Sequence, residues 1–262
     1  MVNFERKSCY GLSDLLALVR ILRSPGGCPW DREQTHLSNR RNFLEEAYEA
    51  AEAFDRDDPK LMCEELGDVL MQVFFNVRME EESGRFTLDD VTDGVCRKLL
   101  FRHPHVFGDD PAASAEEVLA SWDALKRAEK GQSTTADAMD SVARSLPALW
   151  RADKLQSKAA KAGFAFPDAA AALAKLEEEV HELRRAAEQG TNAAEEVGDV
   201  LFAAVQAGRF FAVDPEEALQ NTCEKFLSRF RAVERGVLAE GKALADLSDE
   251  ELLARWARAK SE

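Results

Sequence analysis

The sequence has no long apolar run and no excess of basic residues. No apolar stretch approaches the ~20 residues that a membrane-spanning helix needs, and the opening segment MVNFERKSCYGLSDLL has charged and polar residues where a signal peptide has an apolar core. With 49 acidic against 34 basic residues, the net charge is −15. A chain of this charge is a poor partner for nucleic acid or anionic lipid, so we expect neither a nucleic-acid nor a membrane partner.

Paired cysteines are also missing. The five cysteines are scattered along the chain, are odd in number and form no CxxC motif. This argues against a disulfide framework and favours reduced thiols, as in the cytoplasm. We therefore expect a cytoplasmic protein.

Strand-like alternation of apolar and polar residues is scarce. Apolar residues instead recur at helical spacing, as in the series Leu66, Val69, Leu70, Val73, Phe74 and Val77. Helix starts are marked by Asp58 before Pro59 and by the capping pair Ser248 and Glu251. The sequence predicts an all-α fold.

Four short blocks occur twice, in the same order. The pairs are LEEAYEA and LEEEVHE, EELGD and EEVGD, KLLFR and KFLSR, and EVLASWDALK and ELLARWARAK, each separated by 127 to 134 residues. Four blocks that recur in the same order at nearly constant spacing indicate a tandem duplication. The segment KGQSTTADAMDS between the copies lacks apolar periodicity. We therefore predict domains at 1–129 and 142–262, joined by a linker at 130–141.

Each copy gathers carboxylates on two consecutive helical segments. Acids three or four residues apart share a helix face, and an antiparallel hairpin brings the two segments opposite each other. The acids are Glu45, Glu46, Glu49, Glu65 and Asp68 in the first copy, and Glu178, Glu179, Glu182, Glu196 and Asp199 in the second. A solvated face is the alternative. The repetition and the flanking apolar stripes favour a site for Mg²⁺ or Mn²⁺ with a phosphate ligand.

Cations and tryptophans follow the acids in each copy. Lys225 and Arg229 are four residues apart and suit phosphate oxygens. Trp256 and Lys260 share a helix face, and a Trp can stack on a nucleobase. The alternatives are ordinary core packing for the Trp and solvated surface charge for the cations.

The pattern EExxE followed by ExxD resembles the signature of MazG-type nucleoside triphosphate pyrophosphohydrolases of the all-α NTP pyrophosphatase superfamily. Three further stretches also resemble signatures of this family, namely GGCPWDREQTH, RHPHVFGD and RSLPALWRADKLQSKAAKAGF. The resemblance covers nearly the whole chain and implies a two-domain form with tandem helical bundles. One departure is Cys223, with Cys96 as its counterpart, because similar proteins tend to have Asn there.

The resemblance also implies roles for individual residues. Implied metal ligands are Glu46, Glu49, Glu65, Asp68, Glu179, Glu182, Glu196 and Asp199. Glu178 would orient or deprotonate water, and Lys175, Lys225 and Arg229 would contact phosphate. Trp256 and Lys260 would line the nucleotide pocket. The catalytic set is then Glu178, Glu179, Glu182, Glu196, Asp199, Lys225 and Arg229.

The function expected from the resemblance is Mg²⁺-dependent hydrolysis of a nucleoside triphosphate to monophosphate and diphosphate. We expect a broad NTP and dNTP range, a role in nucleotide pool control or house-cleaning, and a homodimer. The second copy should dominate, because it has Lys175 where the first has Asn42. The alternatives are a narrower pyrophosphatase for dUTP or phosphoribosyl-ATP, and a non-catalytic regulatory protein that binds metal or nucleotide.

Overall fold

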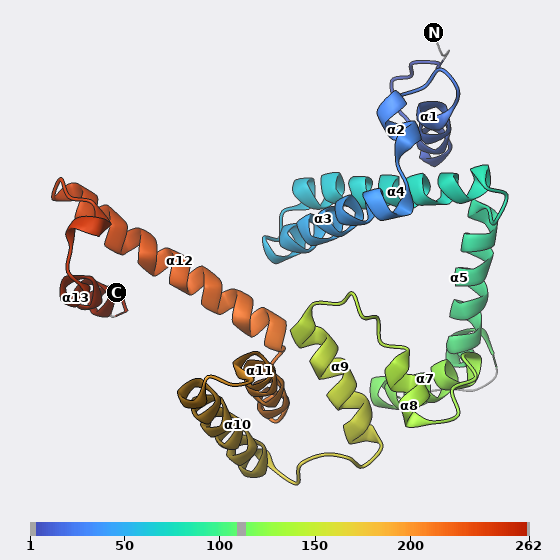
Figure 1. Ribbon diagram of the computed structural model, residues 1–262. Coiled ribbons are helices and arrows are strands. Elements are labelled where there is room, and N and C mark those ends of the chain that lie inside the picture. Colours follow the sequence, from blue (N-terminus) through green and yellow to red (C-terminus); the bar gives the residue numbers. More distant parts are fainter. Residues whose placement is uncertain (1–3, 109–113, 261–262) are drawn as a thin grey trace. The chain divides into compact units, whose positions relative to one another are not determined.

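The computed structural model describes residues 4–108 and 114–260, and every regular element in them is a helix (Figure 1). This confirms the predicted all-α class. The chain divides into two units, Met1–Leu125 and Lys126–Glu262. Asp109, the last residue of the RHPHVFGD motif, lies outside the described residues. Within the described ranges, each helix is too short or too polar to cross a lipid bilayer.

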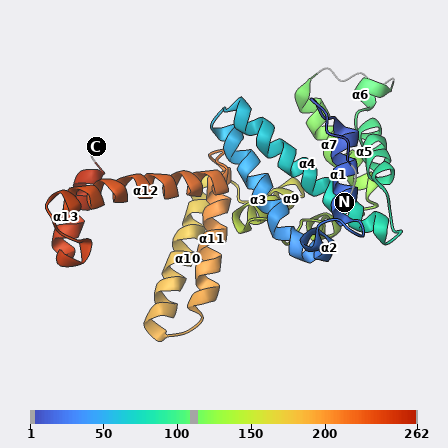
Figure 2. The same cartoon turned by 90° about the horizontal axis from the view of Figure 1, so that it is seen from above.

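The first unit is built around a long helical hairpin. Its elements are α1 (Leu12–Arg23), α2 (Pro29–Glu33), α3 (His36–Asp55), α4 (Pro59–Glu82), α5 (Leu88–Arg102), α6 (Pro104–Phe107) and most of α7 (Ala115–Glu129). Helices α3 and α4 lie side by side in both views (Figures 1 and 2). Asp58 caps α4, as predicted, because its carboxylate accepts hydrogen bonds from the backbone N–H groups of Lys60 and Leu61.

Helix α1 packs on α4 and supplies the centre of the first unit's core. Val19 of α1 is 1% exposed and packs with Phe74, Phe75 and Met79 of α4. Burial of an apolar side chain of this size contributes about 1.5–3 kcal/mol. This cluster fixes α1 against the C-terminal half of α4, so the acidic N-terminal half of α4 remains available.

The second unit repeats the hairpin. Its elements are α8 (Thr135–Asp140), α9 (Ala148–Lys161), α10 (Ala169–Gln189), α11 (Ala193–Arg209), α12 (Pro215–Ala239), the 3₁₀ turn η1 (Leu244–Asp246) and α13 (Asp249–Ala259). Helices α10 and α11 form the hairpin, and α9 packs on α11 as α1 does on α4. Helix α8 lies inside the segment 130–141 that the sequence assigns to a linker, and it packs on α9.

Helix α12 starts at a fixed point. Asp214 accepts hydrogen bonds from the backbone N–H groups of Glu216 and Glu217, and the Trp150 indole N–H also donates to it at 3.1 Å. Asp214 therefore caps α12 and ties its start to α9. Helix α13 packs against α12, and Ser248 and Glu251 form the predicted capping box at its start.

Candidate metal and nucleotide site

The first acidic cluster lies where α3 and α4 face each other. Glu46 and Glu49 come from α3 and Glu65 from α4, and each offers a carboxylate oxygen within 4.8 Å of the others. The sequence predicted Asp68 as a fourth member. It lies outside this triad, but its charge raises the pKa of Glu46. The hairpin thus brings together acids that are about twenty residues apart in sequence.

Two carboxyl groups of this cluster have raised pKa values. Partial burial, followed by the charge of Asp68, raises the pKa of Glu46. Partial burial, followed by the charges of Glu49 and Asp68, raises the pKa of Glu65. Both shifts mean that the ionised carboxylates are unfavourable as they stand, and a bound cation relieves this.

Glu46 is held by a buried amide network that the sequence analysis did not identify. Gln72 is 6% exposed, and its Nε2 donates to Glu46 Oε1 at 3.5 Å. Asn39, which is 3% exposed, donates through Nδ2 to Gln72 Oε1 at 2.8 Å. The signal available was a Gln inside the apolar stripe of α4. The amides orient Glu46 without adding charge.

The second acidic cluster lies on the equivalent hairpin, formed by α10 and α11, and includes Asp199, whose counterpart Asp68 lies outside the first triad. Glu179, Glu196 and Asp199 offer carboxylate oxygens within 4.8 Å of one another. Glu182, the fourth predicted ligand, lies outside this triad and pairs with Arg185 at 2.8 Å. Partial burial, followed by the charges of Glu182 and Asp199, raises the pKa of Glu196. The four acids therefore act on one another electrostatically.

The second cluster has a cation that the first lacks. Lys175 Nζ lies 2.8 Å from Glu179 and 2.9 Å from Glu178, and these two hydrogen bonds raise the pKa of Lys175. Glu179 is 8% exposed, whereas the Lys175 side chain remains 36% exposed to solvent. Lys175 therefore places a positive charge beside the acids of the second cluster.

Both clusters suit a hard divalent cation. Their donors are all carboxylate oxygens, which Mg²⁺ and Mn²⁺ prefer over the sulfur and imidazole ligands typical of zinc. A triad that is partly open to solvent leaves positions for water and phosphate oxygens. The residues present therefore fit such an ion.

The predicted phosphate and base residues lie on α12 and α13. Lys225 and Arg229 form no ion pair with any residue that the structure describes. Trp256 lies against Phe226, with ring centroids 5.1 Å apart, and Lys260 is exposed. Within the described residues, no hydrogen bond or ion pair joins Lys225, Arg229, Trp256 or Lys260 to the acidic cluster. The acids of the hairpin and the side chains of α12 and α13 therefore do not contact each other through hydrogen bonds or ion pairs in the part of the chain that the structure describes.

The equivalent tryptophan of the first unit is engaged differently. The Arg102 guanidinium lies over the Trp122 ring at 5.6 Å, and His103 meets the same ring edge-on at 5.1 Å. The Arg and Trp that would correspond to Arg229 and Trp256 are therefore in contact with each other. This cation–π contact occupies one face of the Trp122 ring.

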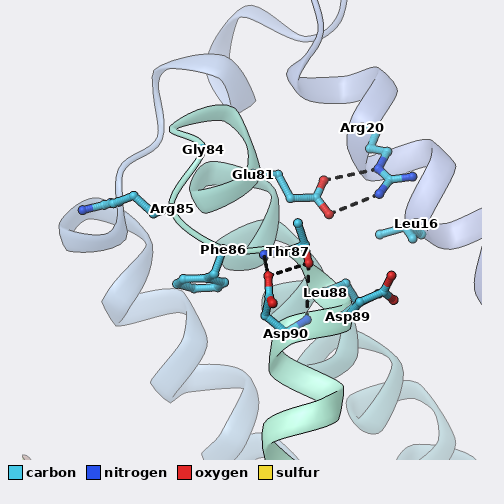
Figure 3. A pocket seen from close by; sticks show the side chains of 10 residues that line it. All are labelled: Leu16, Arg20, Glu81, Gly84, Arg85, Phe86, Thr87, Leu88, Asp89 and Asp90. Carbon is cyan, nitrogen blue, oxygen red and sulfur yellow. Dashed lines mark hydrogen bonds and ion pairs between the residues drawn. The ribbon is translucent and has the colours of Figure 1, made fainter.

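A hollow of about 460 Å³ in the first unit lies away from the acidic cluster, at the turn between α4 and α5 (Figure 3). Arg20 pairs with Glu81 at 3.1 Å across it. Asp90 accepts hydrogen bonds from the backbone N–H and hydroxyl of Thr87, which caps α5. These charged and polar groups have partners in the fold, so they explain how α1 and α5 are attached to α4.

Comparison with known proteins gives a consistent result. The MazG nucleotide pyrophosphohydrolase domain matches residues 34–107 and 168–233, which contain both hairpins. The nucleoside triphosphate pyrophosphohydrolase/pyrophosphatase MazG of Thermotoga maritima is 40% identical over 94% of this chain and 94% of its own length. The nucleoside triphosphate pyrophosphohydrolase of Escherichia coli K12 is 41% identical over 94% of this chain and 95% of its own length. The nucleoside triphosphate pyrophosphohydrolase of Mycolicibacterium smegmatis is 38% identical over 79% of this chain and 64% of its own length.

Proposed function

Since the chain belongs to the MazG nucleotide pyrophosphohydrolase family, we propose that its second acidic cluster is the principal centre at which a nucleoside triphosphate is hydrolysed to monophosphate and diphosphate. The chain is a hydrolase that acts on phosphoric anhydrides. The observation that carries the assignment to this centre is Lys175, whose Nζ lies 2.8 Å from Glu179, a member of the triad whose oxygens converge within 4.8 Å.

Each side chain has a defined task in this proposal. Glu179, Glu196 and Asp199, with Glu182, would hold Mg²⁺, for which Mn²⁺ could substitute, and the ion would supply Lewis acidity. Glu178 orients the attacking water at the α-phosphorus. Lys175, Lys225 and Arg229 neutralise charge on the departing diphosphate.

The choice of the second cluster rests on differences between the two units. Lys175 pairs with Glu179 at 2.8 Å, whereas the first unit has Asn42 at the equivalent position. In the first unit Trp122 is covered by Arg102, whereas Arg229 has no ion-pair partner among the described residues. The first cluster then binds metal but contributes less to turnover.

The complete site is proposed to form in a homodimer. The second hairpin exposes a set of large apolar side chains, namely Val180, Val197, Leu201 and Phe202, at 40–49%. Hairpins from two copies can pack into a four-helix bundle that buries such a stripe. A second copy can then also supply the cations of α12 to the acids of α10 and α11.

The substrate range is proposed to be broad across NTPs and dNTPs, with a cytoplasmic role in nucleotide pool control.

The test is product analysis with ATP, GTP, CTP, UTP and the dNTPs in Mg²⁺, with hydrolysis in ¹⁸O-water. We expect monophosphate and diphosphate from several bases, with the label in the monophosphate. Label in the diphosphate would contradict attack at the α-phosphorus. Turnover of dUTP or phosphoribosyl-ATP alone would favour a narrower enzyme, and no turnover would favour a regulatory binding protein.

A further inference from the structure

Three aromatic side chains form a row on α12 and α13 of the second unit. Phe226 stacks on Phe230, with ring centroids 6.2 Å apart and 20° between the ring planes. Phe226 also meets Trp256 of α13 at 5.1 Å and 50°. Phe226 and Phe230 are 57% and 37% exposed, so burial in a core does not explain the row. Arg229 shares a helix face with Phe226, because it follows three residues later.

The backbone that carries Trp256 is held without help from these rings. Helix α13 folds back on the end of α12 (Figures 1 and 2). Arg255 Nη2 donates to both carboxylate oxygens of Glu240, at 2.9 and 2.7 Å. Because this ion pair attaches α13 beside Trp256, the position of the Trp256 ring depends on the side chains around it. Phe226 is its aromatic neighbour.

The first unit has different side chains at both phenylalanine positions. The blocks KLLFR and KFLSR, which are 127 residues apart, match Leu99 with Phe226. The same spacing matches His103 with Phe230. The first unit therefore has no aromatic ring at the position that contacts the tryptophan in the second unit.

The tryptophan of the first unit contacts an arginine instead. The Arg102 guanidinium lies over the Trp122 ring at 5.6 Å. In the second unit, no such contact joins Arg229 to Trp256 among the residues that the structure describes. A tryptophan ring attracts a phenyl ring and a guanidinium with comparable strength. The side chain three residues before the arginine can therefore decide which of the two the tryptophan contacts.

We propose that Phe226 is a positioning residue for nucleotide binding. Its ring holds Trp256 away from Arg229, so the tryptophan is available to a base and the arginine to a phosphate. Phe230 supports the Phe226 ring from the other side. With Leu99 at this position in the first unit, the equivalent tryptophan and arginine contact each other. This inference rests on the proposed nucleotide contacts of Trp256 and Arg229.

The test measures the binding of diphosphate in Mg²⁺ to the full chain by calorimetry. Diphosphate has no base, so its affinity reports on phosphate contacts alone. Phe226→Leu installs the residue of the first unit. We expect the dissociation constant to rise roughly tenfold, the effect of one hydrogen bond to a charged group. Phe226→Tyr keeps the ring and should bind as wild type does. Phe211→Leu changes another exposed phenylalanine of the same unit and should also bind as wild type does.

An Arg229→Gln background separates positioning from a general structural effect. Arg229→Gln alone should raise the dissociation constant by roughly tenfold. Adding Phe226→Leu should then cause no further loss, because the arginine that the ring keeps available is gone. A second tenfold loss would show that Phe226 acts by another route and would overturn the inference.

The remaining outcomes separate this inference from the proposed function. Unchanged diphosphate affinity in Phe226→Leu would overturn the positioning role, and hydrolysis of triphosphates by the wild type would leave the proposed function standing. Failure of the wild type to bind diphosphate would also overturn it, because Arg229 would then have no phosphate to contact. If the wild type hydrolyses no triphosphate but shows the loss that depends on Arg229, the hydrolase centre is wrong and the positioning role is supported.

Discussion

Glu46 and Glu179 occupy equivalent positions in the two hairpins but have different partners. Glu46 accepts a hydrogen bond from the neutral Gln72, whereas Glu179 pairs with Lys175. Equivalent acidic residues are therefore held once by an amide and once by a cation. Only the second arrangement adds a positive charge beside the acid, as the proposed triphosphate substrate would need.

Charge removal at these residues should affect the two units unequally. Glu179→Gln or Glu182→Gln deletes a metal-binding charge with little change of shape. We expect diphosphate release to fall by at least ~10–100-fold, the loss seen even for partners of metal ligands. Glu46→Gln and Glu49→Gln are the matched controls and should retain most of the activity. The opposite pattern would identify the first cluster as the main centre, and equal partial losses would mean that both turn over.

The buried amide pair of the first hairpin should be coupled. Gln72→Ala leaves the buried Asn39 side chain without its partner, which should lower the free energy of unfolding by about 1–3 kcal/mol. The double variant Asn39→Ala/Gln72→Ala should lose less than the sum of the single variants, because neither amide is then unpaired. The second hairpin has Ala172 and Ala203 at the matching positions. Urea unfolding measures the cycle, and strictly additive losses would contradict the pairing.

At the scale of elements, each hairpin places acids from two helices at one seam, and capping fixes where the helices begin. Asp58 and Asp214 both precede a proline and both cap the helix that follows. These starts set the register of the long helices. The capping residues therefore matter to the site although they do not touch it.

Helix α13, which carries Trp256, depends on its capping box. Glu251 accepts hydrogen bonds from the Ser248 backbone N–H and hydroxyl, and these hold the pKa of Glu251 below its ordinary value of 4.5. A lowered folded-state pKa adds stability above the ordinary value, and this stability is lost as pH falls through the folded-state pKa. The melting temperature of Glu251→Gln should therefore lie below that of wild type at pH 7, and the gap should narrow as the pH falls below the ordinary pKa of 4.5 and through the lower folded-state pKa. A gap of constant size across this range would contradict the role of the ionised carboxylate.

At the scale of the whole molecule, apolar surface remains uncovered on both hairpins. Leu44, Tyr48 and Leu66 are 40–52% exposed in the first, and Leu201 and Phe202 are 49% and 45% exposed in the second. Exposed patches of this kind commonly mark interfaces. We therefore expect light scattering at micromolar concentration to give twice the chain mass of 29.1 kDa. A particle of the chain mass would rule out the homodimer.

A divalent metal ion should stabilise the folded protein and should also be required for its activity. The clusters hold repelling carboxylates whose pKa values are raised, and a cation that binds only the folded state shifts unfolding by mass action. Chelation should therefore abolish diphosphate release and lower the melting temperature, and Mg²⁺ should restore both. Full activity of a metal-free preparation would contradict the carboxylate site.

The sequence by itself determined the helical class, the duplication, the caps at Asp58 and Ser248, and the acids of both clusters. Apart from the duplication, which the repeated blocks show directly, those features depend on short-range spacing, because residues three or four apart share a helix face wherever the helix lies. Contacts between distant segments needed the tertiary structure. It alone paired Gln72 with Asn39, and it showed that Lys225 and Arg229 of α12 form no ion pair with the acids among the described residues. These depend on which helix faces pack together, and a linear pattern does not specify that.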